Sequence, residues 1–70
     1  MELTAVLTRA QDGGYVALNP ETGSTTQGET VEAAVANLVE ATTLYVSEFP
    51  LPATGPPIFT MITVPESAHA

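Results

Sequence analysis

Residues 12–38, which read DGGYVALNPETGSTTQGETVEAAVANL, decide the fold. Asp12 and Gly13 open this stretch and favour the positive φ angles that a tight hairpin turn needs. The apolar residues 15–18 follow as a short returning strand. This strand ends before Pro20, because proline cannot donate a hydrogen bond to a neighbouring strand. The beginning of the stretch therefore predicts a β-hairpin.

The end of the same stretch predicts the start of a helix. Thr30 is a favoured N-cap residue, and Glu32 places a negative charge in the first turn, where the helix dipole favours it. The helical spacing continues to about Ser47, and Pro50 prevents further extension. The apolar stripe of this helix consists of Val31, Ala34, Val35, Leu38, Ala41, Thr42, Tyr45 and Val46.

Three more strands are expected, one inside this stretch and two outside it. Residues 2–9 alternate between two faces, which predicts a first strand, and residues 24–27 predict a third, polar strand at a sheet edge. Four prolines in residues 50–57 predict a stiff connector; a proline-rich ligand is the less favoured alternative. Residues 58–64 are expected to form a last strand that ends at Pro65. The elements predict one α+β domain over residues 1–70, with the order β-β-β-α-β and a frayed tail over 65–70.

Composition limits the chemistry of this 70-residue chain. It has no cysteine, and its single histidine, His69, lies near the C-terminus, so we expect no disulfide, no metal site and no cofactor. Eight carboxylates stand against one basic side chain, Arg9, giving a net charge of −7. This balance disfavours direct binding to nucleic acid or an anionic membrane. It fits a basic protein partner, or solubility alone.

The chain carries no targeting signal that the sequence reveals. No run of about 18 apolar residues predicts a membrane span. The N-terminus lacks the basic and apolar regions of a signal peptide, so we expect a cytoplasmic protein.

The expected last strand is apolar on both faces. Ile58, Ile62 and Val64 lie on one face, and Phe59 and Met61 lie on the other. One helix covers only one face of a small sheet, so apolar side chains would remain exposed, which indicates an interface. We therefore expect a homodimer or larger homo-oligomer. The candidate interface residues are Tyr15, Phe59 and Met61.

Several short motifs, taken in order, resemble the HicB family of antitoxins. They are Asp12-Gly13-Gly14-Tyr15-Val16-Ala17, Pro20-Glu21, Thr26-Gln27-Gly28-Glu29-Thr30, Glu32-Ala33, Asn37-Leu38, Glu40-Ala41 and Leu44-Tyr45. The similarity covers residues 5–48, and the last expected strand extends it. This sequence departs from the family pattern at Ser24, where cysteine is common, and at Ala33, where a capping-box glutamate is missing.

The resemblance implies a fold and a role. The fold would be a cut-down ribonuclease H-like domain: a four-stranded mixed sheet of order 3-2-1-4 with one helix on one face. The role would be that of a toxin–antitoxin protein that masks HicA, a small basic RNA-cleaving toxin. Many family members also carry a C-terminal DNA-binding domain, and we expect none in this sequence.

The residues argue against catalysis. Two-metal nuclease chemistry needs several carboxylates that converge, yet the first expected strand offers only Glu2 and the last offers none. Asp12 has a sufficient role in its turn, and His69 is expected to be solvated. Gly13, Gly14 and Gly28 lack the spacing and the lysine of a phosphate-binding loop. We therefore expect a binding protein and no enzyme.

The candidate partner-binding residues lie on the helix. They are Glu32, Glu40, Tyr45 and Glu48. The carboxylates spread over its outer surface, with no lysine or arginine four residues away to pair with them. They predict docking to a basic partner, although a merely solvated helix face is the alternative. A stand-alone, homo-oligomeric HicB-like module with another partner is the alternative function.

Overall fold

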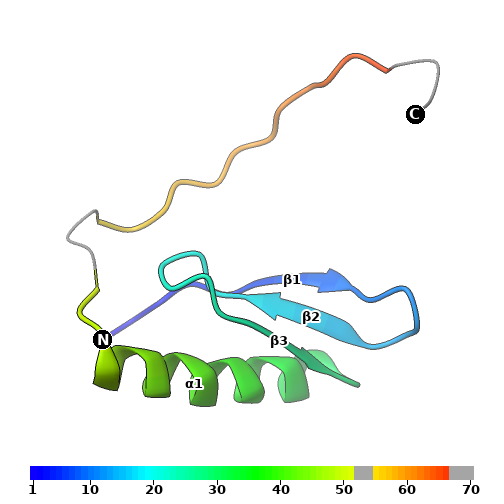
Figure 1. The fold of residues 1–70 in the computed structure, drawn as a ribbon. Coiled ribbons are helices and arrows are strands. Elements are labelled where there is room, and N and C mark those ends of the chain that lie inside the picture. The colour runs from blue at the N-terminus through cyan, green and yellow to red at the C-terminus, as the bar shows by residue number, and fades with distance from the viewer. Residues whose placement is uncertain (52–54, 67–70) are drawn as a thin grey trace.

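A computed structural model describes residues 1–51 and 55–66, which form a small sheet with one helix against it (Figure 1). The strands are β1 (Val6–Arg9), β2 (Tyr15–Leu18) and β3 (Thr25–Gly28), and the helix is α1 (Val31–Glu48). The sheet has the order β1-β2-β3, and both pairings are antiparallel. The predicted hairpin, the polar edge strand and the helix are thus confirmed, with β1 shorter than expected and β3 shifted by one residue.

The core lies between the sheet and one face of α1. Ala17 and Ala34 are fully buried and Leu38 is 3% exposed, while Leu7 and Tyr15 pack against them from the sheet. Leu7 and Ala17 are direct neighbours across the β1–β2 pair, so they share a face. Small residues at the centre let the helix approach the strands closely.

Residues next to the core fix the position of β3 against α1. The Thr26 hydroxyl donates a hydrogen bond to the Ala34 carbonyl (2.9 Å). The Asn37 side-chain amide donates to the Gln27 carbonyl (2.8 Å). These two bonds hold the edge strand to the first half of the helix, in addition to the apolar contacts.

The ends of α1 follow the local sequence. The Thr30 hydroxyl accepts a hydrogen bond from the Ala33 amide (3.0 Å), as expected of an N-cap residue. At the other end, the Phe49 amide still donates to the Tyr45 carbonyl (2.9 Å), but Phe49 itself is extended, with ψ 136°. The residue before a proline avoids the helical region, so Pro50 explains this end.

The expected four-stranded mixed sheet of order 3-2-1-4 is wrong. The sheet has three strands, and residues 58–64 form no strand. They run away from both the sheet and α1 as an extended segment (Figure 1). The physical reason is that alternating apolar residues indicate an extended, half-buried segment but do not specify which strand it pairs with. The element order within the described residues is therefore β-β-β-α.

Candidate functional site: the acidic helix face and the surface hollows

The exposed side of α1 carries the three predicted carboxylates. Glu32, Glu40 and Glu48 are all exposed, and successive members are eight residues apart, which turns each by about 80° from the one before. Arg9, the only lysine or arginine in the sequence, lies on β1, with its guanidinium 5.7 Å from the centre of the Tyr15 ring. The helix therefore presents negative charge over its outer surface with no basic residue of its own.

Tyr45 lies apart from most of that surface. It is half-buried at the end of α1, and its ring centre lies 5.0 Å from that of Phe49. Glu48 is at the same end of the helix, so the structure brings Tyr45 and Glu48 to one end. Glu32 lies in the first turn, at the opposite end. A partner that contacts all four candidate residues must therefore extend along the whole helix.

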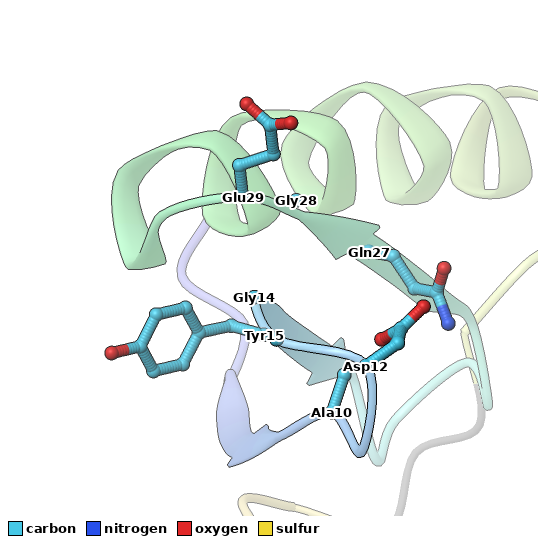
Figure 2. Close-up of a pocket in the computed structure, with 8 residues that line it drawn as sticks. Ala10, Asp12, Gly14, Tyr15, Gln27, Gly28 and Glu29 are labelled. Carbon is cyan, nitrogen blue, oxygen red and sulfur yellow. The ribbon is translucent and has the colours of Figure 1, made fainter.

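A hollow of about 490 Å³ lies at the end of the β1–β2 hairpin (Figure 2). Asp12, Tyr15, Gln27 and Glu29 contribute side chains to its lining. In Figure 2 the Tyr15 ring and the Glu29 carboxylate project in different directions from Asp12, so these groups do not converge on one point. The arrangement offers a polar surface depression, and its groups are not placed to act together on a substrate.

Glycines shape the backbone around this hollow. Gly13 and Gly14 have φ angles of 89° and 81°, which glycine adopts without strain. The turn is closed by hydrogen bonds from the Gly13 amide to the Ala10 carbonyl (3.3 Å) and from the Ala10 amide to the Gly14 carbonyl (3.1 Å). These glycines therefore have a structural role in the hairpin.

A second hollow, the apolar groove, lies between the N-terminal residues and the C-terminal half of α1. Its volume is about 280 Å³. Its main apolar lining residues are Leu3, Ala5, Val35, Leu38, Val39 and Val46. No ionisable side chain is among its lining residues. The groove therefore suits an apolar side chain or segment better than a charged ligand.

The three candidate interface residues lie in two different environments. Tyr15 is half-buried and packs against the core. Phe59 and Met61 are 61% and 95% exposed and belong to the extended segment. The structure thus does not gather the three into one patch, and a shared interface stays a prediction.

A polar cluster that was not predicted from the sequence holds the N-terminal residues against the β2–β3 loop. Asn19 is 1% exposed, and its amide nitrogen donates to the Thr4 carbonyl (2.7 Å) and to Glu21 Oε1 (2.6 Å). Its oxygen accepts from the amide (2.8 Å) and the hydroxyl (2.6 Å) of Thr22. Asparagine before a proline-containing turn is the signal that indicates such a capped loop.

The carboxylate of Glu21 completes this cluster. It accepts hydrogen bonds from the Thr4 amide (3.0 Å) and the Thr4 hydroxyl (2.7 Å) as well as from Asn19. The bond from the Thr4 amide, followed by that from its hydroxyl, lowers the pKa of the Glu21 carboxyl below its ordinary value. Hydrogen bonds to the ionised form favour that form. Glu21 is therefore a source of pH-dependent stability.

We expect acid to weaken the fold through Glu21. Because its pKa is lowered in the folded state, its stabilisation is complete above the unfolded-state pKa and is lost as the pH falls through the folded-state pKa. The free energy of unfolding, measured by urea denaturation, should therefore fall from about pH 5 downward more steeply in the wild type than in Glu21→Gln. Glu66→Gln is the control variant, because it removes one negative charge at an exposed position. If the free energy of unfolding depends on pH in the same way in the wild type and in Glu21→Gln, this role of Glu21 is contradicted.

The described residues contain neither a metal-binding cluster nor a helix that could span a membrane. Among residues 1–51 and 55–66, no three histidine or carboxylate side chains lie close enough to hold a metal ion. Within the same residues, α1 is not long and apolar enough to cross a membrane.

The chain is similar to a protein of known sequence. The UPF0150 protein ssl0738 of Synechocystis sp. is 46% identical to this chain over 48 residues, which is 67% of each chain. No family model matches the sequence. No solved structure matches it either. On the identity and coverage of that relative, the chain belongs to the UPF0150 family.

Proposed function

We propose that this chain is a HicB-like antitoxin that binds and masks a small basic, HicA-like RNA-cleaving toxin and has no catalytic activity of its own. The observation that carries the proposal is the outer face of α1, where Glu32, Glu40 and Glu48 are exposed with no basic residue on the helix. Membership of UPF0150, a family commonly tied to HicB-like proteins, supports it.

The charge of the whole chain favours the same kind of partner. A protein that cleaves RNA needs a basic surface to hold phosphates. A chain of net charge −7 attracts such a surface over a distance, and the carboxylates along α1 would occupy the place of the phosphates. Complementary charge of this kind mainly raises the association rate and sets the orientation of the complex. Masking therefore needs no chemistry on the part of the chain.

The second candidate function is that of a homo-oligomeric interaction module with another partner. The exposed apolar residues of the segment 58–64 favour it, since a patch of this kind usually marks an interface. The gene beside that of this chain separates the two candidates. A gene for a short basic protein with a single histidine favours the antitoxin role, and its absence favours the module.

Charge neutralisation on α1 tests the antitoxin role. We expect Glu32→Gln, Glu40→Gln and Glu48→Gln together to slow association with the basic neighbour about tenfold at about 0.01 M salt. The difference should shrink at about 0.5 M salt, where charges are screened. Stopped-flow fluorescence measures both rates.

The matched control removes the same charge elsewhere. Glu2→Gln, Asp12→Asn and Glu66→Gln change exposed carboxylates outside the helix. If the outer face of α1 is the docking surface, this control slows association much less than the helix variant. If the two variants slow association equally, the effect comes from net charge alone, and docking on α1 is contradicted.

A further inference from the structure

We propose that the chain forms a dimer by reciprocal exchange, in which the segment Ile58–Val64 of each copy occupies the apolar groove of the other. Two features of the same chain support it: an exposed apolar segment that runs away from the sheet and the helix (Figure 1), and an apolar groove between the N-terminal residues and α1. The inference is independent of the antitoxin role.

The segment has the exposure of an interface that lacks its partner. Its large apolar side chains are Ile58 (92% exposed), Phe59 (61%), Met61 (95%), Ile62 (80%) and Val64 (67%). Burial of such side chains is a main source of protein stability, so leaving five of them in water is a large cost for one short stretch. Contiguous exposure of this kind is rare in a monomer and marks a binding surface.

The groove suits apolar side chains of the segment. Residues 55–65 carry no ionisable side chain, and neither do the residues that line the groove. Two copies of net charge −7 repel one another, so contact is favoured where neither surface carries a carboxylate. At about 280 Å³ the groove has room for some of these side chains but not for the whole segment.

The direction of the segment favours a second copy as its partner. Phe49 leaves the helix in an extended conformation before Pro50, and Pro56 and Pro57 stiffen the approach to the segment. The segment runs away from the sheet and from α1 of its own chain (Figure 1). β1, which continues from the residues lining the groove, is an edge strand that an extended segment can also pair with. A twofold exchange occupies both grooves with one kind of contact.

Substitution in the groove tests the exchange in the full chain. Val39→Asp places a charge in the groove, and Leu44→Asp places the same charge on α1 outside it; the two side chains are similarly exposed, at 59% and 63%. In sedimentation equilibrium, we expect the wild type to dimerise, Val39→Asp to weaken the dimer at least about tenfold, and Leu44→Asp to change it within about twofold. A monomeric wild type, or equal effects of the two variants, would overturn the proposal.

Mixing two defective variants separates exchange from other modes of assembly. Met61→Asp with Ile62→Asp spoils the segment but leaves the groove intact, whereas Val39→Asp does the reverse. We expect each to be largely monomeric alone, and the mixture to form a heterodimer through the one intact groove and the one intact segment. If the mixture stays monomeric, the segment acts within its own chain or on another protein, and the proposal is wrong. Circular dichroism of each variant checks that the domain is folded.

Discussion

Gly28→Ala is expected to destabilise the domain by about 3 kcal/mol or more. A Cβ atom added at Gly28 would lie 2.7 Å from the carbonyl carbon of Ala33 and 2.8 Å from the Cα of Ala34, and closest to the Ala34 nitrogen. These are backbone atoms of the first helical turn, so no side-chain rotation relieves the overlap. The close approach of β3 to α1 would have to open, although the bonds from Thr26 and Asn37 hold it closed.

Gly23→Ala is the matched control for this substitution. Gly23 has a φ of 77°, but an added Cβ would meet no atom within 4 Å. Its cost is therefore the left-handed backbone conformation alone, about 1 kcal/mol. Urea denaturation measures the free energy of unfolding of both variants. Near-equal losses of this free energy would contradict the close approach of β3 to α1. Because a domain of this size has only a few kcal/mol of stability, we expect Gly28→Ala to be largely unfolded.

Asn19→Asp is expected to cost about 3 kcal/mol at neutral pH, although it changes only one group. It replaces the buried amide nitrogen, which donates to the Thr4 carbonyl and to Glu21, with an oxygen that repels both. It also places a second negative charge beside the Glu21 carboxylate. The N-terminal residues would lose their attachment to the β2–β3 loop, and with them one wall of the apolar groove.

The control for Asn19→Asp is Asn37→Asp. Asn37 is exposed and its amide makes one bond, to the Gln27 carbonyl, so we expect a loss of about 1 kcal/mol. The two variants should also differ in their response to pH. Protonation of the introduced carboxylate restores a hydrogen-bond donor at position 19. The stability that Asn19→Asp loses relative to the wild type should therefore be smaller in acid. Thermal unfolding at several pH values measures this, and equal deficits for both variants would contradict the role of Asn19.

The parts of the fold that local chemistry determines could be predicted from the sequence. Thr30 caps the helix because its hydroxyl needs only the amide three residues ahead. The hairpin forms at the predicted place and β2 has the predicted bounds, but the positive φ angles lie at Gly13 and Gly14 and not at Asp12. Each of these features depends on residues that are neighbours in the chain.

The parts that depend on distant partners could not be predicted in the same way. Residues 58–64 have the alternation of a strand, but no feature of the segment specifies an edge of its own sheet. The expected fourth strand came from the family resemblance together with this pattern, and it is wrong. The buried role of Asn19 is not predictable from its neighbours in the chain, because its contact with Thr4 joins residues fifteen apart.

The positions of the candidate site residues could be predicted from the sequence, but their binding role could not. The exposure of Glu32, Glu40 and Glu48 follows from the helical period, which also places Tyr45 toward the inner side. The identity of the partner could not be predicted, because exposed carboxylates spread over a helix fit any basic surface. The binding roles of these four residues therefore stay predictions until a partner is tested.

Inhibition of RNA cleavage tests the central claim most directly. A small basic HicA-like protein would be incubated with a fluorescently labelled RNA while increasing amounts of the chain are added. The antitoxin role predicts that cleavage falls to background once the chain and the basic protein are present in stoichiometric amounts. Cleavage that continues at an unchanged rate in a large molar excess of folded chain would contradict it.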